Sequence, residues 1–168
     1  MAKSKKRKGN LSVLMDYAGR RRVLTYLSWV LSAISALTAL VPFIFVWLIV
    51  RGVIEANGNF AAVQGSLSVY GWWAVGSALI SMLVYFAALM CSHVAAFRVA
   101  GNMRKRAMRH IGALPVGFMN SLGSGRGRRI VNESSGATET YLAHQLPDMV
   151  GAFATPVGMI VLLFVFDW

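Results

Sequence analysis

The stretch VLTYLSWVLSAISALTALVPFIFVWLIV, Val23–Val50, decides the class of fold because none of its 28 residues is charged. Two other stretches are nearly as apolar: Gly52–Phe97 has the single charge Glu55, and Met149–Phe166 has none. A helix needs about 20 apolar residues to cross the hydrocarbon core of a bilayer. We therefore predict an all-α, polytopic membrane protein whose spans cover about residues 23–50, 69–97 and 146–167.

The overall composition supports this class. Hydrophobic residues make up 57% of the chain and charged residues 14%, yet the net charge is +11. Soluble domains usually have about 45–50% apolar and about 25% charged residues. A secretory signal peptide is the alternative for the first stretch, but its apolar part is too long and lacks a small-residue cleavage site at the expected distance. The single Cys91 excludes a disulfide within the chain and is expected to be a packing residue.

The basic residues predict the orientation of the spans. Eight Lys and Arg residues precede the first span, eight more lie between Arg98 and Arg129, and the loop Arg51–Ser68 has one. Cytoplasmic loops carry the excess of Lys and Arg in membrane proteins. We expect residues 1–22 to form a basic cytosolic tail, the connection 98–147 to be cytosolic, and the protein to be a multi-pass protein of the cell membrane.

Small residues recur along one face of each span at steps of three or four. Such stripes let helix backbones approach closely in lipid. We expect them to pack the bundle, with the lining of a substrate path as the alternative. Pro42 lacks an N–H group and is expected to kink the first span. The stripes are Ser28, Ser32, Ser35 and Ala39; Ala74, Ala78, Ser81, Tyr85, Ala88 and Ser92; and Gly151, Thr155 and Gly158.

The connection 98–147 has the pattern of a helical hairpin. An apolar stripe from Phe97 to Leu114 continues the second span as a helix, which Pro115 should end. A short apolar segment follows, then the basic, glycine-rich Gly123–Arg129, which we expect to be flexible. A second helical pattern begins near Arg129 and leads to the third span. An apolar end to such a hairpin is costly to expose, so we expect it to dock on a partner.

The connection also carries a recognisable pattern. MRKRAMRHIGALP, Met103–Pro115, is followed by Phe118, Gly125, Ile130 and Glu133. This order resembles the first intracellular loop of ATP-binding cassette (ABC) transporters with the exporter-type (type-1) membrane domain. The run TYLAHQLPD, Thr140–Asp148, resembles a subgroup of that family associated with siderophores and other metallophores. The resemblance covers residues 23–168, as the first three of six expected spans.

The resemblance implies a role for the end of the hairpin. In the family this segment is a coupling helix that seats in a groove of the nucleotide-binding domain, and ATP-driven closure of two such domains switches the membrane cavity between inward- and outward-facing states. A second membrane half, from an identical or a related subunit, is also implied. The coupling positions in this sequence would be Pro115, Val116, Phe118, Met119 and Asn120.

Two features depart from the family. Gly127 stands where the family usually has a hydrophobic residue, which should weaken the start of the next helix by about 1 kcal/mol. The 168 residues contain no G-x-x-x-x-G-K-[ST] phosphate loop. We therefore expect no enzymatic activity and no cofactor in this chain, with ATP and Mg²⁺ bound by a partner nucleotide-binding domain. We also expect the chain to be a partial or truncated product.

Other candidate sites are weaker. His144 and Asp148 lie four residues apart, but a metal site needs more ligands, and hydrogen bonding between helices is the preferred interpretation. His93 is expected to be hydrogen-bonded within the bundle rather than to mark a pathway. No residue pattern indicates catalysis or metal binding.

Two other functions remain open from the sequence. Three spans could assemble into a small membrane scaffold or an oligomeric pore, although no polar stripe or intramembrane charge supports a pore. The basic clusters could instead bind nucleic acid. No aromatic residues interleave them, and such clusters are usual beside spans, so we expect no nucleic-acid partner.

Overall fold

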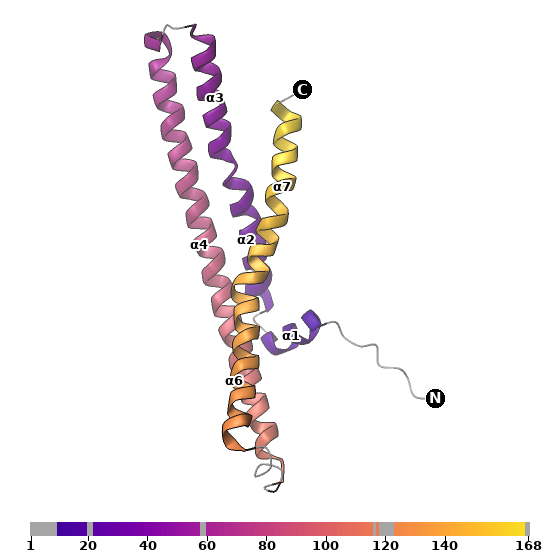
Figure 1. The fold of residues 1–168 in the computed structure, drawn as a ribbon. Coiled ribbons are helices and arrows are strands. Elements are labelled where there is room, and N and C mark those ends of the chain that lie inside the picture. Colours follow the sequence, from indigo (N-terminus) through magenta and orange to yellow (C-terminus); the bar gives the residue numbers. More distant parts are fainter. Residues whose placement is uncertain (1–9, 20–21, 58–59, 116, 118–122, 167–168) are drawn as a thin grey trace, which may run out of the picture. The chain divides into compact units, whose positions relative to one another are not determined.

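The computed structural model describes residues 10–19, 22–57, 60–115, 117 and 123–166. All regular elements in these residues are helices (Figure 1). Three helical segments of the described chain are long and apolar enough to cross a membrane, so the predicted fold class is confirmed. They are Arg22–Glu55, Val63–Gly112 and Gly125–Phe166.

The first of these segments is broken near its middle. Helix α2, Arg22–Thr38, ends in a turn, and helix α3, Val41–Glu55, begins with a proline in its first two positions. The N–H groups of Leu40 and Phe43 bond the carbonyls three residues before them, at 3.1 Å each, instead of four. Pro42 has no N–H to donate and its ring clashes with a continuing helix, so the predicted kink is a short break.

The second segment is one helix, α4, Phe60–Gly112. It starts nine residues earlier than the predicted span, and α3 extends to Glu55, so most of the predicted loop Arg51–Ser68 is helical. Arg51 Nε bonds Glu55 Oε1 at 2.7 Å, one turn away, which supports the end of α3. Helix α4 ends as predicted before Pro115, in a turn where the Leu114 N–H bonds the Ile111 carbonyl at 3.1 Å.

The return helix α6, Ser124–Thr140, begins earlier than predicted. The segment Gly123–Arg129 was expected to be flexible, and this prediction was wrong from Ser124 onward. Gly123 has φ 73°, a conformation that favours glycine, and its carbonyl accepts the Gly127 N–H at 3.2 Å. Gly127, which has low helix propensity, lies buried in the first turn of this helix.

The third segment continues from α6 through a widened turn. Residues Tyr141–Gln145 form a π-helix, and α7 runs over Leu146–Phe166. The widened turn ends two residues before Pro147, which cannot donate to the carbonyl four residues earlier. Pro156 lies inside α7, where the helix continues past it.

The N-terminal region contains a further helix, α1, Asn10–Ala18. It lies within residues 1–22, which were predicted to be a basic tail. Met15 and Ala18 are buried. Leu11, Leu14, Met15 and Ala18 are spaced three and four residues apart, and this helical spacing is the signal that could have identified α1.

The chain divides into two compact units. One unit comprises Met1–Leu27 and Met90–Leu146, and it contains α1, the start of α2, the C-terminal part of α4, α6 and the π-helix. The other comprises Ser28–Leu89 and Pro147–Trp168, with most of α2, α3, the N-terminal part of α4, and α7. We call them the hairpin unit and the span unit and describe each separately.

Candidate functional site

The stem of the hairpin unit is packed through small residues. In Figure 1, α6 lies beside the C-terminal part of α4. Ala96, Val99 and Ala100 of α4 are completely buried, and Leu142 and Ala143 are nearly so. Because alanine adds only a methyl group, the two helix backbones can approach closely. The buried part of the stem therefore combines alanines with two larger side chains, Val99 and Leu142.

A hydrogen bond joins the two sides of the stem at the π-helix. In an α-helix the carbonyl of Ala143 would accept the N–H of residue 147, and Pro147 has none. The Ser92 hydroxyl donates to this carbonyl instead, at 2.8 Å, and both residues are buried. The serine of one helix thus satisfies the backbone group that the proline leaves without its usual donor.

Two charge interactions lie further along the stem. Arg104 Nη2 of α4 lies 3.4 Å from Glu139 Oε2 of α6, with side-chain exposures of 42% and 25%. Arg129 and Glu133 pair at 2.7 Å within α6 and are well exposed. Exposed pairs contribute little stability, so of the two only the Arg104–Glu139 pair, which is partly buried and joins different helices, adds to the cohesion of the stem.

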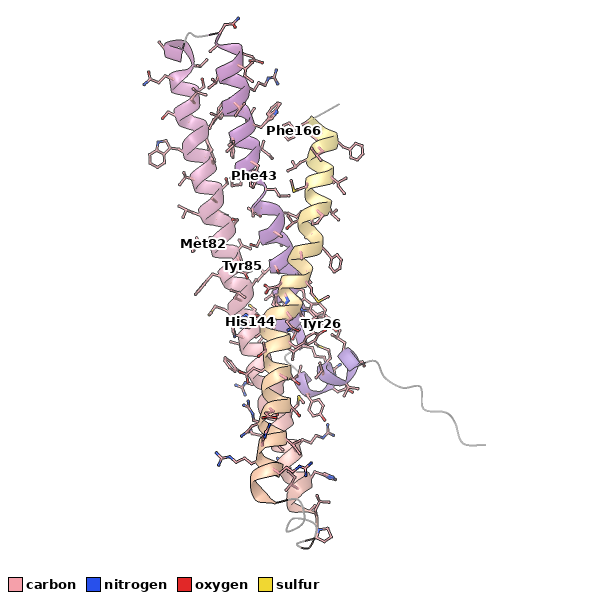
Figure 2. All side chains as sticks on the ribbon, in the orientation of Figure 1. Tyr26, Phe43, Met82, Tyr85, His144 and Phe166 are labelled. Carbon is pink, nitrogen blue, oxygen red and sulfur yellow. The ribbon has the colours of Figure 1, made fainter. Side chains whose placement is uncertain are left out.

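Two histidines meet across the stem. The rings of His93 on α4 and His144 in the π-helix lie edge to face, with centroids 4.8 Å apart and planes at 83° (Figure 2 labels His144). His93 also contacts Phe97, at 5.9 Å between centroids. This pair could not be predicted from the sequence, because it joins residues 51 positions apart. In the described residues no group of three or more His, Cys, Asp or Glu side chains could hold a metal ion.

For Asp148 the structure shows the predicted kind of contact, a hydrogen bond between helices. In the span unit, Asp148 accepts a hydrogen bond from the Tyr85 hydroxyl of α4 at 3.3 Å. This is the inter-helix hydrogen bond expected at this position, with a partner that the sequence did not reveal. The preferred interpretation, bonding between helices rather than a metal site, therefore holds for Asp148.

Helix α1 packs on the stem. The Asn102 Nδ2 donates to the Tyr17 carbonyl at 2.8 Å, and the Arg106 guanidinium lies 5.3 Å from the centre of the Tyr17 ring. Arg22 Nε, at the start of α2, donates to the Met15 carbonyl of α1 at 2.9 Å. These contacts join α1 to the stem and to the first residues of α2.

The end of the hairpin holds the predicted coupling residues. Pro115 is exposed, directly after the last turn of α4. Val116, Phe118, Met119 and Asn120 lie outside the described residues. Their predicted contact with a partner stays a prediction.

The small-residue stripes of the span unit make helix contacts. The Ser32 hydroxyl donates to the Pro147 carbonyl at 2.6 Å, and the Ser35 hydroxyl to the Ser81 carbonyl at 3.1 Å. Gly158 of α7 is buried, and a Cβ built there would lie 2.6 Å and 2.8 Å from methyl carbons of Leu40 and Leu37. These stripe positions pack the bundle, the preferred one of the two interpretations.

An apolar cavity of about 570 Å³ opens between α3 and α7 in the span unit. Phe43 and Trp47 of α3 line it, together with Met159 and Phe166 of α7 (Figure 2 labels Phe43 and Phe166). The Trp47 and Phe166 rings lie 4.8 Å apart. A cavity of this size and lining suits an apolar group.

Known proteins have sequences similar to that of this chain. The model of the ABC transporter transmembrane region matches residues 25–168. The mycobactin import ATP-binding/permease protein IrtA of Mycobacterium tuberculosis is 33% identical over 142 residues, which are 84% of this chain and 16% of that protein. Proteins of the same name from Mycolicibacterium thermoresistibile and Mycolicibacterium smegmatis are 29% and 27% identical, again over 84% of this chain.

This chain spans about one sixth of the length of these relatives, 15% to 16%. The match covers the three apolar segments and the hairpin between the second and third of them. The resemblance predicted from the hairpin sequence is therefore confirmed. The chain belongs to the ABC transporter transmembrane region family.

Proposed function

We propose that this chain is part of the membrane domain of an ATP-driven transporter and couples to a nucleotide-binding domain through the hairpin 98–147. The observation that carries the proposal is the construction of the stem. Alanine packing, the Ser92–Ala143 hydrogen bond and the Arg104–Glu139 pair hold its two helices together. A stem held at several levels can transmit a displacement of its end, which a loose loop cannot.

In this proposal, residues 1–22 are a cytosolic tail and residues 23–168 belong to the membrane domain. ATP and Mg²⁺ bind to the partner, which would perform the hydrolysis, and a second membrane half completes the transport pathway. The names of the relatives combine an ATP-binding and a permease function, which supports a motor of this kind. The same names make mycobactin the first substrate to test, with the apolar cavity between α3 and α7 as part of its path.

Photo-crosslinking at the end of the hairpin tests the coupling. A photoreactive amino acid at position 115 of the full chain, in cells that also produce the intact transporter, should capture a protein with a G-x-x-x-x-G-K-[ST] motif, identified by mass spectrometry. The matched control carries the same amino acid at position 51, which we place on the opposite side of the membrane. Capture of such a protein at both positions, or at neither, would refute the coupling.

Cysteine labelling tests the orientation. In a Cys91→Ser background, Glu55→Cys should react with a membrane-impermeant maleimide added to intact cells, and Arg109→Cys should react only after permeabilisation. Both positions are exposed in the structure, so burial would not explain a difference. The reverse pattern would place the basic hairpin outside and contradict the cytosolic assignment.

A further inference from the structure

A second cavity, of about 500 Å³, lies in the hairpin unit, where α1, α4 and α6 meet. Its lining combines apolar side chains with Tyr17 of α1, Arg106 and His110 of α4, and Ser134 and Ser135 of α6. The polar groups thus come from three helices that are far apart in the sequence. The transport function proposed above makes no use of this cavity.

The charge of the cavity is positive. None of its lining residues is acidic. The described acidic residues of this unit have other partners: Asp16 pairs with Arg22, Glu133 with Arg129, and Glu139 with Arg104. The Arg106 charge is therefore not neutralised by a carboxylate at the cavity.

Arg106 is also held in a suitable position. Its guanidinium lies 5.3 Å from the centre of the Tyr17 ring, and the Tyr17 carbonyl is fixed by Asn102 at 2.8 Å. Attraction to the ring uses the face of the guanidinium, whereas its N–H donors point outward in its plane. The donors therefore stay available to an anion.

A buried hydroxyl supplies a second donor. Ser135 is only 2% exposed and lines the same cavity. A serine hydroxyl can donate a hydrogen bond to an oxygen atom of a ligand that enters the cavity.

We propose that this cavity binds a phosphate group, as a free phosphate compound or in the headgroup of an anionic phospholipid. Arginine forms paired hydrogen bonds with phosphate oxygens, and a serine hydroxyl adds a further donor. Arg106 and Ser135 are the principal ligands, and His110 and Ser134 lie at the same cavity. The apolar lining accommodates the organic part of such a ligand.

The test uses the purified full chain in phosphate-free maltoside micelles and two probes, inorganic phosphate and short-chain phosphatidic acid, followed by ³¹P NMR titration. We expect saturable binding of at least one probe. Arg106→Gln should weaken it by about tenfold or more, because a paired, charge-assisted contact is lost. Arg109→Gln removes the same charge from the same helix outside the cavity and should change binding by less than about twofold.

Two further variants separate binding from folding. Arg106→Lys keeps the charge but loses the forked geometry, and should bind more weakly than wild type and more tightly than Arg106→Gln. Ser135→Ala should weaken binding with little change in the unfolding midpoint. Binding of phosphatidic acid alone would assign the site to lipid, and binding of both probes to the phosphate group itself. Equal losses in Arg106→Gln and Arg109→Gln, or no saturable binding of either probe, would overturn the proposal.

Discussion

Replacing Ser92 by alanine tests whether the serine compensates for Pro147. The Ser92 hydroxyl bonds the Ala143 carbonyl at 2.8 Å, and both residues are buried. A hydrogen bond of this kind contributes about 1 kcal/mol net in proteins, and those between membrane helices average about 0.6 kcal/mol with a maximum of about 1.7. The Ser92→Ala substitution leaves the buried Ala143 carbonyl without this donor, so its cost should lie in the upper part of the range for membrane helices. We expect Ser92→Ala to lower the free energy of unfolding by about 1–1.5 kcal/mol.

The role of the proline is tested by a double-mutant cycle. In Pro147→Ala, residue 147 has an N–H that can donate to the Ala143 carbonyl. Ser92→Ala should then cost at least about 0.5 kcal/mol less than it does in the wild-type chain. Any packing change caused by Pro147→Ala alone cancels in the cycle, provided that it is independent of Ser92.

The measurement is SDS-induced unfolding of the full chain in maltoside micelles, followed by far-ultraviolet circular dichroism. Ser77→Ala is the matched control, because the Ser77 hydroxyl bonds the Ala74 carbonyl at 2.9 Å within one turn of the same helix. It should change the free energy by less than about 0.5 kcal/mol. Additive effects of Ser92→Ala and Pro147→Ala, within about 0.3 kcal/mol, would refute the compensation.

Three other predictions use the same unfolding measurement. Gly158→Ala places a Cβ within 2.8 Å of two leucine methyl groups and should destabilise the chain by about 1–3 kcal/mol. Gly76 has open space around it, so Gly76→Ala should stabilise the chain by up to about 1 kcal/mol. Equal effects of the two substitutions would contradict the close approach at Gly158. Arg104→Gln should lower the free energy of unfolding by up to about 1 kcal/mol, and by less at high salt, because it removes the ion pair with Glu139. Arg109→Gln should lower it by less than about 0.5 kcal/mol. A loss in Arg104→Gln that does not depend on salt would exclude the ion pair as its source. Tyr85→Phe removes one exposed hydrogen bond to a carboxylate on α7 and should cost under about 1 kcal/mol, and a larger loss would mean that the tyrosine has a second structural role.

The fold was largely predictable because its main determinants are local. An uncharged run longer than 20 residues has few alternatives to a spanning helix, so the segments containing Val23–Val50 and Met149–Phe166 were identified directly. The effects of Pro42 and Pro115 were also predictable, since a proline without an N–H interrupts helical hydrogen bonding wherever it lies.

The errors in local structure concern segments where tertiary packing outweighs propensity. Gly123–Gly127 has low helix propensity by composition, yet α6 begins at Ser124 and Gly127 is buried within it. Helix α1 is too short to be stable alone, and Met15, Ala18 and Asn102 hold it on the stem.

The candidate sites were less predictable because they depend on the register of helices that are distant in the sequence. His93 and His144 meet only because two helices pack at one particular offset. The same applies to the phosphate cavity, whose Tyr17, Arg106 and Ser135 come from three helices. Single-helix patterns predict which face of a helix is apolar, but not which residue of another helix lies opposite.

The small buried residues described above have a consequence for heat capacity. The buried hydrophobic residues among those described are mostly alanines, and the buried polar residues are all serines and a threonine, while large apolar side chains face outward. Soluble proteins gain roughly 12–15 cal/mol/K per residue on unfolding, because apolar surface becomes hydrated. When these helices separate within a bilayer, their surfaces meet lipid tails instead of water.

The heat capacity change should therefore be far smaller than for a soluble chain of 168 residues. The free energy of helix separation would then vary almost linearly with temperature, without the dome that gives soluble proteins a temperature of maximum stability. Cooling should strengthen the assembly steadily, and cold denaturation should not occur.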